Sequence, residues 1–381
     1  MLWFRGGQAH EPITTKVRFN KEVIRILQRS CLGCHKPGGI AMSLATYEEA
    51  RPWAKAIKEE ILEHRMPPWR AVKGYGEFAN APKLTQREID LMVNWVEGGA
   101  PKGDDKDFPA GPIYSNEWPL GKPDLILKPE VASEIAGDAD EYRTLTLDAN
   151  LKEDRWLAAI DLQPGNGAVV HCATLSVEGK QIESWVPGEK RVLLPDDVAW
   201  PLKAGSRIAV KIHYRGAGEA TKDQSAVGLY FAKTPPHKQA HEIAINNANA
   251  MIPVGAEIQR VKASFTMQDD AEAIAIRPAV NPLLVSLQTT AYRPDGTEEV
   301  LIWTRGYQFD WRQTYYLKRA IALPKDTRVE VIAYFDNSEA NPNNPNEPPK
   351  AARWSELSPD PLCALVVAHL RATNDWLNNF K

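Results

Sequence analysis

The sequence predicts a multidomain chain in which an all-α domain is followed by an all-β double sandwich. Three observations predict this class. Apolar residues recur at helical spacing through residues 17–99. Residues 101–124 are then rich in Pro, Gly and Asp, which is typical of a linker. Beyond the linker the apolar period changes from 3.6 to 2, and turn residues separate short β-rich runs.

Two capping-box patterns mark helix starts in the first domain. Thr46 with Glu49, and Thr85 with Glu88, each place a hydroxyl three residues before a carboxylate, so the two side chains can cap backbone N–H groups reciprocally. The helix that follows Thr85 should stop at Gly98-Gly99, since glycine commonly ends helices. We therefore expect short helices over residues 17–99, packed around one site.

The motif Cys31-Leu32-Gly33-Cys34-His35 is the attachment sequence of a c-type haem. Two thiols one helical turn apart can each form a thioether with a haem vinyl group, and the histidine that follows can ligate the iron. The alternatives are a redox dithiol or half of a zinc site. A zinc site needs further Cys or His ligands nearby, and a redox dithiol is usual in a βαβ context. Because the flanks look helical and no second C-x-x-C occurs, we predict one covalent haem c.

The second axial ligand should come from farther along the first domain, where Met42, His64 and Met66 are the candidates. Met66 begins Met-Pro-Pro-Trp, in which two prolines stiffen the backbone. Met42 follows His35 too closely to leave much chain for wrapping around the ring, and His64 should lie on the exposed side of a helix end. We predict His35 and Met66 as the axial ligands, a pair that raises the reduction potential relative to bis-histidine ligation.

Composition restricts the partners and the compartment. The net charge is −3 and 25% of residues are charged, so nothing indicates binding to nucleic acid. No run of 18 apolar residues predicts a membrane span. No signal peptide is visible, because Met1–Gly7 turns polar too soon. Covalent haem c is assembled outside the cytoplasmic membrane, so we expect a periplasmic or cell-surface protein.

The β-rich region is long enough for two sandwiches, divided near residue 252. Turn residues separate its runs, and no long helical pattern intervenes, so the strands should be antiparallel. We expect a first domain at 1–100, a linker at 101–124, and sandwiches at 125–251 and 252–381. The runs are Arg143–Leu147, Val169–Val177, Arg207–Tyr214, Ala226–Phe231, Ala271–Ile276, Val300–Trp303 and Arg328–Phe335.

Several short words give the chain a resemblance to a known family. They are Trp53-Ala54-Lys55-Ala56-Ile57, Met66-Pro67-Pro68-Trp69, Asp154-Arg155-Trp156, Pro164-Gly165-Asn166, Val169-Val170-His171, Ile212-His213-Tyr214 and Tyr334-Phe335-Asp336-Asn337-Ser338. The chain resembles a bacterial monohaem cytochrome c fused to a copper type II, ascorbate-dependent monooxygenase-like domain. The family of that second domain includes peptidylglycine α-hydroxylating monooxygenase. The resemblance implies an all-α cytochrome c domain followed by an all-β double jelly-roll sandwich, with one copper in each jelly roll.

The electron-transfer copper of that family is held by a His-His pair and by a histidine before a tyrosine. At these places this chain has His171-Cys172 and His213. Two imidazoles and a thiolate would suit copper or zinc, and a His₂Cys set resembles the ligands of blue copper. The alternative is that these residues are structural. Strand alternation puts His171 and Cys172 on opposite faces, and a bulge would be needed to aim both at one metal.

The oxygen-binding copper of the family uses a Pro-His-Met-His word, a Pro-Asp-Gly word at a fixed interval, and a later methionine. This chain has Pro278-Ala279-Val280-Asn281, Pro294-Asp295-Gly296 and Leu362 instead. No histidine occurs between His241 and His369, so a shifted alignment restores no ligand. Alanine, asparagine and leucine side chains are not ligands for reduced copper. We therefore expect a degenerate copper-monooxygenase scaffold, and an electron carrier in preference to an enzyme.

Three functions are consistent with the sequence. The first is a c-type cytochrome electron-transfer protein, or a subunit of a redox complex, that works with a redox partner protein. The second is a copper- and haem-dependent monooxygenase that hydroxylates a small molecule. The third is a structural subunit of a larger redox assembly. Cys172 and Cys363 are left as a disulfide, as a ligand and a spectator, or as two free thiols.

Overall fold

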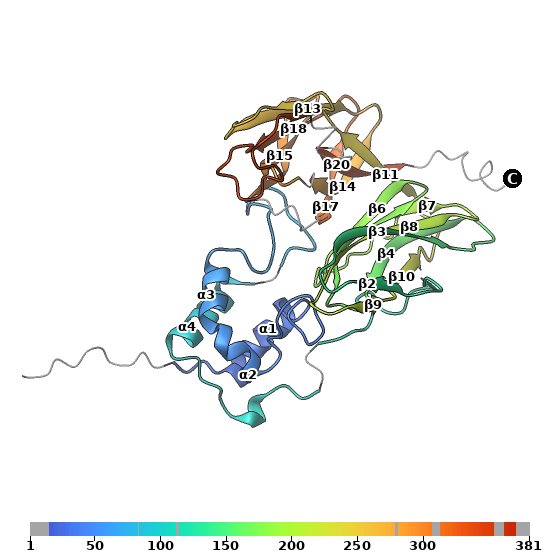
Figure 1. Ribbon diagram of the computed structural model, residues 1–381. Coiled ribbons are helices and arrows are strands. Elements are labelled where there is room, and N and C mark those ends of the chain that lie inside the picture. The colour runs from blue at the N-terminus through green and yellow to red at the C-terminus, as the bar shows by residue number, and fades with distance from the viewer. Residues whose placement is uncertain are drawn as a thin grey trace, which may run out of the picture. The chain divides into compact units, whose positions relative to one another are not determined.

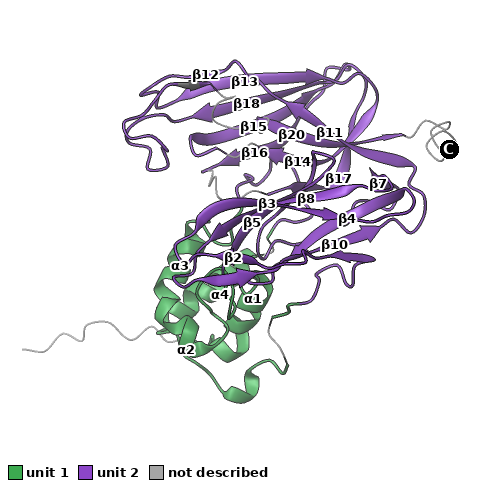
Figure 2. Ribbon diagram, turned by 45° about the vertical axis from the view of Figure 1, so that its right-hand side comes forward, with its two compact units in different colours: residues 1–69, 82–116 green, residues 70–81, 117–381 purple. Residues whose placement is uncertain are grey.

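The computed structural model describes residues 15–82, 84–111, 114–278, 281–306, 313–353 and 362–370. Its contacts divide the chain into two compact units (Figure 2). Unit 1 consists of residues 1–69 and 82–116, and unit 2 consists of residues 70–81 and 117–381. The domain limits that the sequence predicts stay a prediction. The two units are defined by contacts within the structure, and these contacts assign residues 70–81 to the strand-rich unit 2.

Unit 1 contains short helices joined by long irregular segments. A π-helical turn at Phe19–Val23 leads into α1, and a 3₁₀ turn at Arg51–Trp53 joins α2 to α3. The helices are α1 Ile24–Ser30, α2 Tyr47–Ala50, α3 Ala54–Leu62 and α4 Gln86–Glu97. Within the part of the chain that the structure describes, no helix has the length and apolarity to span a membrane.

Both predicted capping boxes are confirmed. The Thr46 hydroxyl accepts from the Glu49 backbone N–H while the Glu49 carboxylate accepts from the Thr46 N–H, and Thr85 and Glu88 make the same pair of bonds. Helix α4 ends at Glu97, directly before the predicted stop at Gly98-Gly99. These short-range patterns succeed because each is satisfied within one helical turn.

The predicted fold class is wrong. An all-α cytochrome c domain before a double jelly roll would put a large fraction of the residues in helices. In the structure, 39% of the described residues are in strands and 13% are in helices. The helical pattern predicted over residues 17–99 is interrupted, because residues 31–46, 63–82, 84 and 85 form no α-helix. The Pro37-Gly38-Gly39 and Met66-Pro67-Pro68 words interrupt the helices, because proline lacks the N–H donor and glycine is entropically costly in a helix.

The strands of unit 2 form antiparallel β-sandwiches, as predicted (Figure 1). In the first half, one sheet has the order β3-β8-β5-β6 and another sheet contains β1-β10-β4-β7. Their inward side chains share one apolar core, to which Leu162, Leu175 and Val210 contribute. The strands are β1 Leu125–Leu127, β3 Asp140–Asp148, β4 Arg155–Gln163, β5 Val170–Val177, β6 Lys180–Trp185, β7 Val198–Leu202, β8 Arg207–Arg215 and β10 Ala226–Phe231, with a separate pair β2 Ser133–Ile135 and β9 Thr221–Asp223.

The second half repeats this layering with the sheet β13-β18-β15-β16 and the strands β11-β20-β14-β17. A short parallel pairing of Lys238 with Val198 joins β11 to β7, so strands of both halves belong to one eight-stranded sheet. The strands are β11 Lys238–Ile245, β13 Gln259–Thr266, β14 Ala271–Pro278, β15 Leu284–Tyr292, β16 Glu298–Arg305, β17 Tyr315–Leu323, β18 Arg328–Phe335 and β20 Cys363–Leu370, with a separate pair β12 Met251–Ile252 and β19 Ala352–Arg353.

Residues 70–81 belong to unit 2 although they lie between two segments of unit 1. Ala71 bridges to Thr304 on β16, and Phe78 bridges to Leu317 on β17. The Asn80 side chain is 3% exposed and donates to the Thr314 carbonyl oxygen at 2.7 Å. The stretch directly after Met-Pro-Pro-Trp is therefore held to the strands by backbone pairing and by a buried amide.

Candidate functional site

The haem motif begins where α1 ends. Cys31 is the C-cap of α1, and its backbone N–H donates to the Leu27 carbonyl oxygen at 2.8 Å. The chain then turns tightly, because the Cys34 and His35 N–H groups both donate to the Cys31 carbonyl oxygen, at 3.1 and 3.0 Å. This turn keeps the two half-buried thiols and the following histidine in one short loop, as two-point attachment to a single ring requires.

The His35 ring is oriented by a second bond. Its Nδ1 lies 2.9 Å from the Met42 carbonyl oxygen, which can only accept, so Nδ1 carries the proton and donates. The neutral ring then keeps its lone pair on Nε2. Metal-ligating histidines almost always hold their other ring nitrogen in this way, which fixes both the tautomer and the direction of the ligand. His35 therefore fits the role of a proximal iron ligand.

The thiols of Cys31 and Cys34 do not fit a redox dithiol. Burial raises the pKa of each thiol to about 12. Thiol–disulfide exchange proceeds through the thiolate, and redox C-x-x-C motifs lower the pKa of the attacking cysteine. The raised pKa values are therefore opposite to the lowered pKa of the attacking cysteine in a redox dithiol.

The three candidates for the second axial position all present exposed side chains. Met42 and Met66 are 45% and 39% exposed, and His64 is also exposed. Met42 belongs to the loop whose carbonyl already holds His35, whereas Met66 belongs to the separate loop that follows α3. A ligand from a segment other than the His35 loop is a residue of the stretch after α3, which contains both Met66 and His64 and excludes Met42.

A second candidate site lies on β5 and β8 in unit 2. The register pairs Val170 with Tyr214 and then Cys172 with His213, so His171 is an extra residue in β5. Such a bulge breaks the strict alternation of side chains. Ligand atoms of His171, Cys172 and His213 lie within 4.8 Å of one another, and the three residues are 8%, 1% and 4% exposed. The bulge at His171 lets the side chains of His171 and Cys172 converge, whereas strict strand alternation would put them on opposite faces.

The surroundings of His213 suit a metal ligand. Its Nε2 donates to Asp140 Oδ1 on β3 at 2.6 Å, and this bond holds the pKa of the Asp140 carboxyl below its ordinary value. The Tyr142 ring stacks on the imidazole with centroids 4.3 Å apart. Nδ1 is buried and has no hydrogen-bond partner among the described residues. A carboxylate on one ring nitrogen and an open lone pair on the other is the usual arrangement of a metal-bound histidine.

The charges at this site favour a metal ion of low charge. Arg215 Nη1 lies 3.4 Å from His171 Nε2, so a guanidinium stands beside the cluster. A nearby positive charge disfavours further positive charge at short range. One thiolate neutralises a monovalent ion completely, and thiolate with imidazole ligands selects copper or zinc. The three residues could therefore hold copper or zinc.

Cys172 and Cys363 are both buried and form no disulfide with each other. The Thr289 hydroxyl donates to Cys363 Sγ at 3.5 Å, and burial raises the pKa of that thiol to about 12. Cys363 is thus a buried spectator, and Cys172 is the cysteine in the cluster.

The positions that correspond to the oxygen-binding copper contain no cluster of donors among the described residues. Asn281 is 1% exposed, and its Oδ1 accepts from the Leu283 N–H at 2.8 Å, so that oxygen stabilises a turn. Leu362 is fully buried. Ala279 lies outside the described residues.

No protein-family model matches the chain, and no curated protein sequence matches it. Among solved structures, the chain is similar to the major capsid protein P2 of bacteriophage PM2 at 8% identity, over 66% of this chain and 98% of that chain, with a TM-score of 0.29. A Paenibacillus xanthan lyase matches at 10% identity over 65% and 25% of the two chains, with a TM-score of 0.18. The PBCV-1 protein VP54 matches at 9% identity over 64% and 92%, with a TM-score of 0.23. At these scores none of the neighbours supports a function.

Proposed function

We propose that the chain is an electron-transfer protein that carries one covalent haem c on Cys31 and Cys34, with His35 and Met66 as axial ligands. The carrying observation is the His35 bond to the Met42 carbonyl oxygen, which leaves Nε2 as the ligand atom within the C-x-x-C-H turn. When bound, haem supplies an iron that changes between ferric and ferrous forms. The residues attach the ring, fix the direction of the imidazole and fill the sixth position with a thioether.

Filling both axial positions suits electron transfer. Two protein ligands leave no open position for dioxygen, and a methionine ligand raises the reduction potential relative to a second histidine. The β-sandwiches of unit 2 then serve to bind a redox partner or to join a larger redox assembly. Because covalent haem c is assembled outside the cytoplasmic membrane, we propose a periplasmic or cell-surface location.

The test uses the four cysteines of the chain in matched pairs. The Cys31→Ser/Cys34→Ser variant should purify without haem after export through a haem c maturation pathway. The Cys172→Ser/Cys363→Ser variant should keep its haem and its reversible spectrum with dithionite and ferricyanide. Loss of haem from both variants, or from neither, would oppose the assignment.

We also propose a copper ion at His171, Cys172 and His213, as a second redox centre. The supporting observation is the convergence of three buried ligand atoms at the bulge. Protein loaded with cuprous copper should keep one copper per chain after dialysis. Oxidation of that copper should give an intense visible band from the bond between the thiolate and cupric copper. Cys172→Ser should abolish the band, whereas Cys363→Ser should keep it. Zinc alone on the purified protein, with no copper uptake, would contradict the assignment.

The hydroxylation alternative is weaker because the family's oxygen-binding ligands are replaced by residues that are poor copper donors. We propose that copper-loaded protein with ascorbate shows no substrate-dependent oxygen uptake. Uptake that depends on a substrate and disappears in His213→Ala would establish the alternative.

A further inference from the structure

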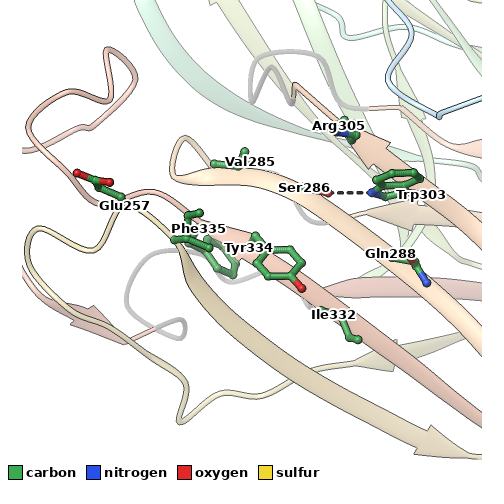
Figure 3. Close-up of a pocket in the computed structure, with 10 residues that line it drawn as sticks. Glu257, Val285, Ser286, Gln288, Trp303, Arg305, Ile332, Tyr334 and Phe335 are labelled. Carbon is green, nitrogen blue, oxygen red and sulfur yellow. Dashed lines mark hydrogen bonds between the residues drawn. The ribbon is translucent and has the colours of Figure 1, made fainter.

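A pocket of about 490 Å³ lies on the outward face of the sheet β13-β18-β15-β16. Cross-strand pairing brings Gln288 opposite both Trp303 and Ile332, and Ser286 opposite both Arg305 and Tyr334. Figure 3 shows these side chains on adjacent strands, with Trp303 and Glu257 toward opposite ends of the view. The volume falls in the range of small-molecule sites, so a single flat ring system with one substituent can fit.

The walls of this pocket are unusually apolar for a sheet surface. Ile258 and Val285 are 77% and 45% exposed, and the Tyr334 ring is 36% exposed beside them. Contiguous exposed apolar side chains commonly mark binding sites. Aromatic walls favour a planar ligand, because rings pair through stacked or edge-to-face contacts.

The central indole is held in place before any ligand arrives. Trp303 Nε1 donates to Ser286 Oγ at 3.0 Å, and that hydroxyl donates to the Thr304 carbonyl oxygen at 2.9 Å. The Tyr75 ring meets the Trp303 ring edge-on, with centroids 4.8 Å apart. Since the wall is already ordered, a ligand loses little affinity to ordering it.

One end of the pocket is cationic. The Arg305 guanidinium lies over the Trp303 ring, 5.3 Å from its centroid, and the ion pairs of the described residues include none to Arg305. A guanidinium that is stacked on an aromatic ring keeps its N–H edge available for a planar carboxylate. Glu257 is the acidic lining residue at the other end, so it repels a second negative charge.

We propose that this pocket binds a small organic monoanion with a flat apolar body, of the aromatic carboxylate class. The ring lies against Trp303 and Tyr334, the carboxylate pairs with Arg305, and Glu257 discriminates against dianions. The site belongs to unit 2 alone, and it stands independently of the haem and copper proposals.

The experiment is a double-mutant cycle between a protein charge and a ligand charge, measured by calorimetric titration. The probes are 2-naphthoate and its neutral counterpart 2-naphthamide. The proteins are the wild type, Arg305→Gln, and Arg319→Gln, which removes an exposed arginine outside the pocket lining. Wild type should bind the acid about fivefold to tenfold more tightly than the amide, as charge-assisted pairing in a half-open site predicts.

Arg305→Gln should remove that preference while leaving amide binding unchanged, and Arg319→Gln should behave as wild type. Tyr334→Ala should weaken both probes to a similar extent, because it removes apolar wall and no charge. No binding of either probe to wild type would overturn the proposal. Equal weakening of acid and amide in Arg305→Gln, or loss of the preference in Arg319→Gln, would overturn it as well.

Discussion

His213 and Asp140 form a short hydrogen bond, with Nε2 and Oδ1 2.6 Å apart, although 73 residues separate them along the chain. The bond joins β8 to β3, and His213 Nδ1 is buried with no hydrogen-bond partner among the described residues. In the proposed copper site, Asp140 would act on the ion through the imidazole, by fixing the ring and raising its basicity.

Asp140→Asn should lower copper affinity about tenfold to a hundredfold, because the carboxylate that orients His213 is replaced by a neutral amide. Glu141→Gln is the matched control: its carboxylate neighbours Asp140 in sequence but pairs with Arg143. Competition of both variants against a cuprous chelator gives the comparison. Equal affinities would assign Asp140 a structural role only.

Met66→Ala should abolish the weak sulfur-to-iron band at the red end of the oxidised spectrum and lower the reduction potential, since a thioether ligand raises that potential. Met42→Ala should retain the band. Retention in Met66→Ala together with loss in Met42→Ala would move the ligand to Met42.

Sequence patterns predicted those parts of the fold that depend on neighbouring residues. The capping boxes at Thr46 and Thr85 are present, and the predicted runs Ala226–Phe231 and Arg328–Phe335 coincide with β10 and β18. Turn residues bound these runs on both sides, so their ends could be placed from the sequence.

The features that position the candidate sites depend on partners far away in the chain. The bulge at His171 follows from the register between β5 and β8, which no local pattern specifies. Residues 70–81 pair with β16 and β17, which begin more than two hundred residues later. The glycines at 74 and 76 could have indicated that the helical pattern was interrupted there.

Asn80→Ala should destabilise the fold by about 1–3 kcal/mol for each buried group that loses its partner. The Asn80 side chain donates to Glu189 Oε1 at 2.9 Å and accepts from the Tyr316 N–H at 3.1 Å. Chemical denaturation measures the change. Asn343→Ala, at an exposed position, should leave the free energy of unfolding within about 0.5 kcal/mol of wild type.

A proteolytic cut between residues 101 and 116 should leave the two fragments associated. Residues 70–81 stay on the first fragment but pair with strands of the second, through Ala71 with Thr304 and Phe78 with Leu317. Gel filtration of the nicked protein should give one coloured species, and two fragments should separate in denaturant. Separation under native conditions would show that this segment does not hold the fragments together.

Glu189 should make stability fall as the pH rises. Burial raises the pKa of its carboxyl from 4.5 to about 8, although Arg191 lies 2.7 Å away and acts in the opposite direction. The folded state therefore keeps the proton between pH 4.5 and 8 while the unfolded chain loses it, so the contribution is complete below pH 4.5 and lost by about pH 8.

The size of this effect is on the order of a few kcal/mol across that window. Denaturation midpoints at pH 5 and pH 8 test it in wild type and in Glu189→Gln. The variant should show a smaller decline, because an amide binds no proton in either state. Asp161, whose pKa burial raises to about 6, contributes a decline of the same sign, and it also lies 3.5 Å from Arg191, so the variant reports the coupled response of Glu189, Arg191 and Asp161. The same decline in both proteins would contradict the assignment.

The covalent attachment of haem to Cys31 and Cys34 is the central claim, and the mass of the denatured chain measures it most directly. Protein exported through a haem c maturation pathway should keep one haem per chain through acidified-acetone extraction. Its haem peptide should contain Cys31 and Cys34 as thioethers, and its alkaline pyridine spectrum should be that of a haem with both vinyl groups saturated. A chain that releases its haem on extraction, or whose Cys31 and Cys34 are recovered as free thiols or joined to each other, would contradict the account.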